Sequence, residues 1–173
     1  MRTRLDLLIQ DSIHDFAEFY VNSTWLGKER DCVNIFALRF LSSNVSEESA
    51  IKELSQIRIE GGVPQPKKFP RPSATKDIVI WEDPIATAWD QDWNPVNTPR
   101  AIIEWKTSRS GSNAPDFDSH DVDWMTSFTT EFPKTIGFLI STHSGEHSRS
   151  CQWALVRNGV LGKIQKKCNS TPT

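Results

Sequence analysis

The sequence is short of the features that mark several classes of protein. No run approaches the roughly 18 apolar residues that a transmembrane helix needs, and the opening residues lack the continuous apolar segment of a secretion signal. The 3 cysteines, Cys32, Cys151 and Cys168, are odd in number and include no CxxC pair. This argues against a disulfide framework or a zinc knuckle. We therefore predict a cytoplasmic protein that does not associate with membranes.

Net charge is also small. The chain has 20 basic and 22 acidic residues, which gives a formal net charge of -2. Proteins dedicated to nucleic-acid binding are often strongly basic, because neutralising phosphates supplies much of their affinity. Any nucleic-acid binding by this chain must therefore come from local basic patches. What is present, 173 residues of which 37% are hydrophobic, suffices for one domain with a single core.

Apolar residues recur at helical spacing in two early segments. The first stripe, which predicts an N-terminal helix, comprises Leu5, Ile9, Ile13, Phe16 and Tyr20. The second, which predicts a helix over 29–41, comprises Val33, Phe36, Ala37, Phe40 and Leu41. A short helix is expected to end near residue 54, and a longer one to span 120–132 before Pro133 ends it.

Segments with the alternation or the compact apolar runs of strands follow the early helices. They are 56–60, 77–81, 101–107, 135–141 and 151–157. The run at 77–81 (DIVIW) is apolar on both faces, so we expect a central sheet covered by helices. The sequence thus predicts an α/β fold with a mixed sheet of about five strands. We divide the single domain, 1–173, into an N-terminal helical extension (1–28), a core (29–157) and a frayed tail (158–173).

Charged side chains interrupt two of the predicted strands. Because side chains alternate along a strand, Glu104 and Lys106 project together while Trp105 points the other way. Asp77, which opens the neighbouring strand, supplies a second carboxylate. Two carboxylates suit a hard cation such as Mg²⁺ or Mn²⁺, with the backbone carbonyl of Trp105 as a third ligand. Lys106 would then orient a metal-bound water and stabilise charge on a phosphate.

Asp77 followed by Glu104-Trp105-Lys106, on consecutive strands after a helix that carries Glu29, resembles the PD-(D/E)xK nuclease superfamily. The one departure is Lys76, which stands where the motif's name expects proline. The resemblance implies a restriction-endonuclease-like core over residues 29–157 and a Mg²⁺-dependent endonuclease that hydrolyses DNA. It also implies that Glu29 joins the catalytic residues, and a carboxylate on that helix's inward stripe is otherwise unusual.

Five basic residues are candidates for binding the DNA backbone. Lys67, Lys68, Arg71 and Lys76 lie in or just after a proline-rich segment that contains no acid, and Arg109 follows Lys106 closely. Such residues neutralise phosphates in nucleic-acid complexes. The alternative is a solvated loop that binds nothing.

Other interpretations of the same residues stay open. Glu104 and Lys106 would form an exposed ion pair if their strand lay at a sheet edge. His143, Glu146 and His147 match the HxxEH string of a zinc protease class, but Gly145 and the surrounding serines indicate a turn rather than the required helix. The chain could also be a non-catalytic, nuclease-like binding or regulatory subunit, or a catalytic part that acts as a homodimer or with a partner subunit.

Overall fold

The computed structural model describes residues 4–109, 117–146 and 148–170. Helical segments come first: α1 (Leu5–Asn22), α2 (Glu29–Ile35), the π-helix η1 (Phe36–Leu41), and the short 3-10 helices η2 (Ser42–Asn44) and η3 (Leu54–Gln56). They confirm the helices predicted from the two apolar stripes. None of the described helices is long and apolar enough to cross a bilayer.

The strands form one sheet in the described part of the chain. They are β1 (Ile57–Pro64), β2 (Ser73–Ile80), β3 (Ala101–Arg109), β4 (Ile136–Ser144), β5 (Ser148–Arg157), β6 (Val160–Leu161) and β7 (Gln165–Ser170). Their order is β1-β2-β3-β4-β5-β6, with β7 also paired to β5. Only β3 and β4 are parallel among these pairs, and their connection contains α3 (Ser119–Glu131). A parallel pair needs such a crossover, which here covers one face of the sheet.

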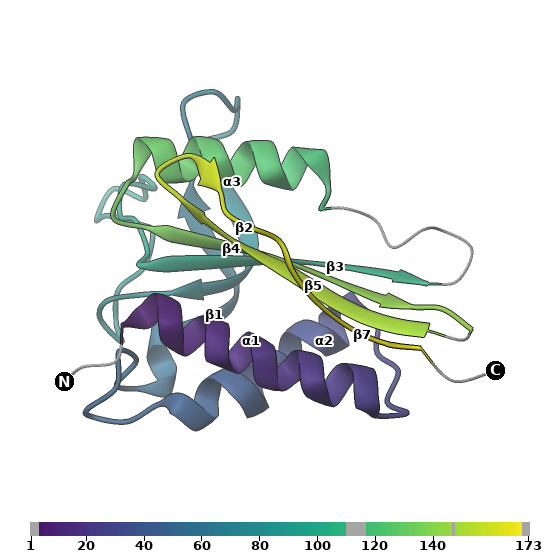
Figure 1. The fold of residues 1–173 in the computed structure, drawn as a ribbon. Helices are drawn as coiled ribbons and strands as arrows, with labels where there is room; N and C mark the ends of the chain where they lie inside the picture. Colours follow the sequence, from purple (N-terminus) through teal and green to yellow (C-terminus); the bar gives the residue numbers. More distant parts are fainter. Residues whose placement is uncertain (1–3, 110–116, 147, 171–173) are drawn as a thin grey trace.

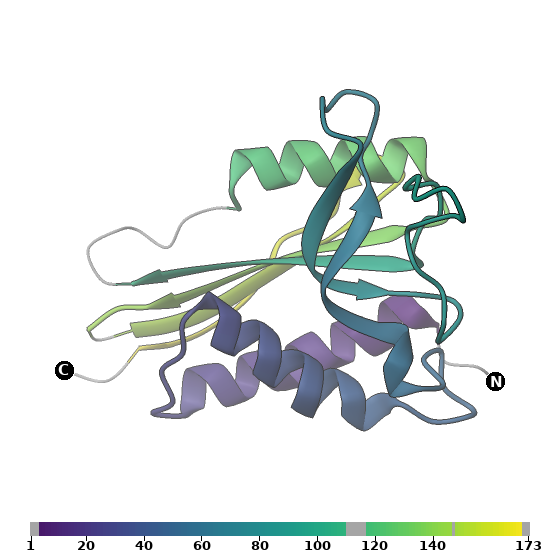
Figure 2. The same cartoon turned by 180° about the vertical axis from the view of Figure 1, so that it is seen from behind.

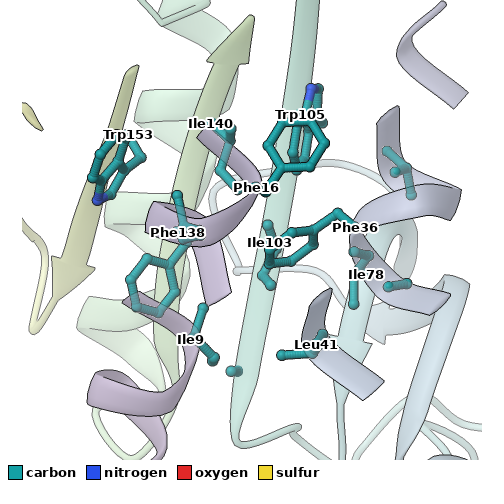
Figure 3. Close-up of a cluster of buried hydrophobic side chains, with 14 of the residues drawn as sticks. Ile9, Phe16, Phe36, Leu41, Ile78, Ile103, Trp105, Phe138, Ile140 and Trp153 are labelled. Carbon is teal, nitrogen blue, oxygen red and sulfur yellow. The ribbon is translucent and has the colours of Figure 1, made fainter. Parts of the chain in front are cut away.

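Helices lie on both faces of the sheet, with α1 and α2 on one side and α3 on the other (Figure 1). The stripe on α1 packs on the sheet because its apolar residues recur every three or four positions. Phe16 is fully buried and meets the ring of Trp105 edge-on, with the ring centroids 4.8 Å apart. Phe36 packs beside both rings from η1 (Figure 3). This first core packs α1 and η1 against one face of β3 and so holds that strand in place.

The second core lies between α3 and the opposite face of the sheet. Trp124, Met125 and Phe128 of α3 are buried in a cluster with sheet residues such as Ile102 and Leu139. The helix begins after Asp118, whose side chain accepts hydrogen bonds from the backbone N–H groups of the first turn, 2.8 Å from that of His120. A carboxylate there satisfies donors that have no partner within the helix.

The structure confirms an α/β fold with a mixed central sheet, but the sheet has seven strands rather than about five. The difference lies in the tail, for which the prediction of fraying was wrong. Val160–Leu161 and Gln165–Ser170 both pair with β5. The sequence of β7, QKKCNS, has no apolar alternation, so this strand forms through backbone pairing with an available edge.

Candidate active site

The strands β2 and β3 pair over only a short distance. Their register runs from Ile80 opposite Ala101 to Ile78 opposite Ile103, and no further pairs follow. Beyond that point the β1–β2 hairpin turns away from β3 towards α3 (Figure 2). Asp77 and Glu104 are the next residue on each strand. We call this place, with Lys76, Asp77, Glu104 and Lys106, the β2–β3 fork.

Asp77 bridges the two strands where their backbone pairing stops. Its Oδ2 accepts a hydrogen bond from the backbone N–H of Trp105 at 2.7 Å. Its own backbone N–H lies 3.5 Å from Oε2 of Glu104. The N–H and C=O groups of one strand residue face the same edge, so the carbonyl of Trp105 also faces the fork. The carboxylates of Asp77 and Glu104 therefore lie close together at the fork, with this carbonyl at the same edge of β3.

Glu104 is buried in the centre of the sheet, since β3 lies between β2 and β4. This contradicts the alternative of an exposed ion pair at a sheet edge. Its ion pair is with Lys76, whose Nζ contacts Oε1 of Glu104. Buried charges need such partners. Lys76 was predicted as a phosphate contact; only 8% of its side chain is exposed, and its ammonium lies in the fork.

Lys106 projects from the same face of β3, as alternation predicts. Its Nζ lies 3.4 Å from Oδ2 of Asp121 on the first turn of α3. Glu29, the first residue of α2, approaches from the other side of the sheet and accepts a hydrogen bond from the backbone N–H of Thr107 at 3.2 Å. Helix α2, strand β3 and helix α3 thus bring Glu29, Lys106 and Asp121 to one end of the fork.

The electrostatics of the fork differ from those of a solvated surface. Burial, with the neighbouring carboxylate of Asp77, raises the pKa of Glu104 to about 7, and Lys76 offsets part of that rise. Burial also raises the pKa of Glu29, although Lys106 opposes the change. Burial acts to lower the pKa of Lys106, but the carboxylates of Asp121, Glu29 and Glu104 outweigh it and raise that pKa. Lys106 is therefore held as an ammonium.

The described side chains contain no ready-made group of three or more His, Cys, Asp or Glu ligands for a metal ion. The fork offers two carboxylates and one backbone carbonyl instead. This donor set fits Mg²⁺, which is commonly bound by one or two carboxylates and keeps several water ligands. In the conformation described, Oε1 of Glu104 is engaged by Lys76.

The predicted phosphate contacts other than Lys76 lie on the surface. Lys67, Lys68 and Arg71 are exposed in the loop between β1 and β2. That loop packs along α3, because the backbone N–H of Lys67 donates to Glu131 and Lys68 forms an ion pair with Asp123 at 2.5 Å. Arg109 is exposed at the end of β3. The fork and these basic residues are thus separate features of the structure.

The sequence did not identify the roles of Lys76 and Asp121. Asp121 lies on the first turn of α3, and the fold brings it to Lys106. The absence of proline before Asp77 was the one signal for Lys76. The described part of the HxxEH string is not helical, since His143 lies on β4 with its Nδ1 hydrogen-bonded to Ser108 Oγ at 2.9 Å, and Gly145 lies in the β4–β5 turn. His147 lies outside the described residues.

A cavity of about 600 Å³ elsewhere in the structure is a weaker candidate site. Its lining charges largely neutralise one another. Arg4 and Arg157 both bind Asp6, at 2.5 and 3.1 Å, and Arg100 binds Glu82 at 2.7 Å. The fork, by contrast, holds the buried carboxylate of Glu104 and the half-buried carboxylate of Asp77 beside an ammonium at a break in the sheet.

Comparisons of this chain with models of protein families, with curated proteins and with solved structures find no match. The functional argument therefore rests on the residues of the fork.

Proposed function

We propose that this chain is a Mg²⁺-dependent nuclease of the PD-(D/E)xK type that hydrolyses phosphodiester bonds of DNA. The observation that supports this most is the convergence of Asp77 and Glu104 at the fork, with Lys106 on the same face of β3. The element order also supports a restriction-endonuclease-like core. After the early helices, three antiparallel strands are followed by the α3 crossover and by β4 parallel to β3.

In this proposal Asp77, Glu104 and the carbonyl of Trp105 hold one Mg²⁺ or Mn²⁺ ion. Such an ion, when bound, activates water for attack and neutralises charge that builds up on the phosphate. The fork suits this role because its ligands come from a sheet fixed by two cores. Asp77 is oriented by its hydrogen bond to the backbone of Trp105, and Glu104 by burial in the central strand.

Lys106 serves as a charged donor rather than as a base. Its pKa is raised because neighbouring carboxylates, chiefly Asp121, outweigh the effect of burial. An ammonium can orient the attacking water and stabilise negative charge on the phosphate, but it has no lone pair to accept a proton. Asp121 positions Lys106 from α3, and Glu29 adds negative charge on its other side.

The chain as a whole is not basic, since its net charge is -2. In this proposal local basic residues therefore make the DNA contacts. Lys67, Arg71 and Arg109 are exposed. Lys68 is also exposed, but its ammonium is bound to Asp123. We expect these contacts to depend strongly on salt, because each neutralised phosphate releases counterions.

A second candidate is a non-catalytic subunit that uses the same scaffold to bind DNA or a partner protein. The specific observation in its favour is the ion pair of Lys76 with Glu104, which leaves one of the two carboxylates less available to a metal ion. The acidic net charge agrees with a chain that acts in a homodimer or with a partner subunit. Cleavage assays distinguish the two candidates.

The test incubates the protein with linear, circular and branched DNA in the presence of Mg²⁺, Mn²⁺ or a chelator. We expect nicking that needs the metal and that falls about 10²–10³-fold in Lys106→Ala, the loss typical when a charge-stabilising donor is removed. Asp77→Asn should be similarly impaired. Lys163→Ala, at an exposed lysine outside both the fork and the cavity, is the matched control and should cleave like the wild type.

Activity that survives both Lys106→Ala and Asp77→Asn would reject the nuclease proposal for this site. Binding without cleavage in any metal would favour the second candidate. Gel filtration and gel-shift assays at several salt concentrations, run on the same preparations, would then show whether the chain binds DNA alone or as an oligomer.

A further inference from the structure

Lys76 is the least expected residue of the fork. Its side chain is 8% exposed, and its ammonium contacts Oε1 of Glu104. The same Nζ lies 3.7 Å from the centroid of the Trp124 ring on α3. The ammonium is therefore held between a carboxylate and an aromatic face, and both contacts come from elements other than its own strand.

The placement depends on a local irregularity in the β1–β2 pair. Two adjacent residues of β2 reach Glu104 in different ways, Lys76 through its side-chain ammonium and Asp77 through its backbone N–H. The register skips the pairing of Asp77 with Glu60, and Glu60 has a φ of 54°. A non-glycine residue seldom adopts that conformation. The backbone opposite Asp77 is thus distorted next to the position from which Lys76 reaches Glu104.

A divalent cation that uses Glu104 must compete with this ammonium. Lys76 occupies one of the two carboxylate oxygens, so the fork contains a cation of its own. Trp124 gives the ammonium a second partner, since an aromatic ring attracts a cation near its face. Lys76 can thus release Glu104 without losing every favourable contact.

We propose that Lys76 is an internal competitor for the metal ion, which weakens divalent-cation binding at the fork by holding Glu104 in the metal-free state. This inference rests on the proposed function, because it assumes that Asp77 and Glu104 are the metal ligands. It makes Lys76 a positioning residue that sets metal affinity, rather than a phosphate contact.

The first test measures Mn²⁺ binding at pH 8.0 by titration calorimetry, without DNA, in four proteins. They are the wild type, Lys76→Met, Lys76→Arg and Lys68→Met. Methionine keeps the length of the side chain and its contact with Trp124 but removes the charge. Lys68 is the matched control, because it also contacts a carboxylate and an aromatic ring, those of Asp123 and Phe69, but on the surface.

We expect Lys76→Met to bind Mn²⁺ about tenfold or more tightly than the wild type, the effect of removing one charge-assisted hydrogen bond that competes for the ligand. Lys76→Arg and Lys68→Met should bind like the wild type. If the wild type binds Mn²⁺ and a folded Lys76→Met binds it equally or more weakly, the role of Lys76 is overturned but the proposed function stands. No binding by any of the four proteins overturns both.

A second test needs no variant, which matters if Lys76→Met does not fold. Acetylation of the wild-type lysines is followed by mass spectrometry with and without Mn²⁺. Lys76 should be protected in the metal-free protein and should react at least severalfold faster with Mn²⁺ present, while Lys68 stays unchanged. Unaltered protection of Lys76 at a saturating Mn²⁺ concentration would overturn the proposal.

Discussion

The buried carboxyl of Glu104 gives the stability of the protein a specific dependence on pH. Burial and Asp77 raise its pKa to about 7, against an ordinary value of 4.5 in the unfolded chain. Between these values the folded protein retains a proton that the unfolded chain has released. The free energy of unfolding must therefore fall as the pH rises from about 4.5 to about 7.

The separation of the two pKa values sets the size of this effect. Each pH unit of separation is worth about 1.4 kcal/mol, so Glu104 alone removes about 3 kcal/mol of stability across the window. The raised pKa of Glu29 adds a change of the same sign. Asp6 has a lowered pKa because Arg4 donates hydrogen bonds to it, and its stabilisation is complete above its ordinary value of 3.8. It therefore does not mask the fall at higher pH.

The perturbation is Glu104→Gln, which keeps the shape of the side chain but cannot ionise. Urea unfolding is followed by tryptophan fluorescence at pH 5, 6, 7 and 8 in the presence of a chelator. We expect the wild type to lose about 3 kcal/mol more stability than the variant between pH 5 and 8. Comparing changes with pH removes the effects of the substitution that do not depend on pH, such as altered packing.

Glu47→Gln is the control, because Glu47 is exposed and lies outside the fork. Its stability should follow the pH profile of the wild type. Parallel profiles for Glu104→Gln and the wild type would refute the reasoning, since they would mean that Glu104 ionises at the same pH in the folded and unfolded states.

Three further outcomes follow from packing and exposure. Phe16→Ala should lower the free energy of unfolding by about 3–5 kcal/mol in urea, because the ring is fully buried against β3, and a loss below about 1 kcal/mol would contradict that packing. Asp118→Ala should cost about 1 kcal/mol in the same assay through loss of the α3 cap, and an unchanged midpoint would count against the cap. In a thiol titration of the native protein Cys168 should react at once, whereas the 2 buried cysteines should react only in denaturant; rapid reaction of all three would contradict their burial.

Much of the fold was predictable because its signals are local. The stripe on α1 and the apolar run of β2 follow directly from which residues must be buried. Alternation along β3 likewise predicted that Glu104 and Lys106 share a face. The contact of Asp77 with the backbone of Trp105 agrees with the predicted convergence on neighbouring strands. These inferences need only the periodicity of helices and strands.

The remainder depends on contacts between residues far apart in the chain. Lys76 looked like part of a basic loop, and its partner Glu104 lies 28 residues away. Asp121 lies on α3, and only the fold brings it to Lys106 of β3. Strand β7 has no apolar pattern, and it forms on the edge of β5 and against α1. No local pattern encodes any of these three contacts.

The claim on which the proposed function depends is that Asp77 and Glu104 hold one divalent cation between them. Anomalous diffraction from crystals grown with Mn²⁺ tests it most directly. We predict one strong peak in the fork, coordinated by a carboxylate oxygen of each residue and by the carbonyl of Trp105, with Lys76 moved off Glu104. Mn²⁺ bound only elsewhere, with the Lys76–Glu104 ion pair intact at a saturating Mn²⁺ concentration, would contradict the claim.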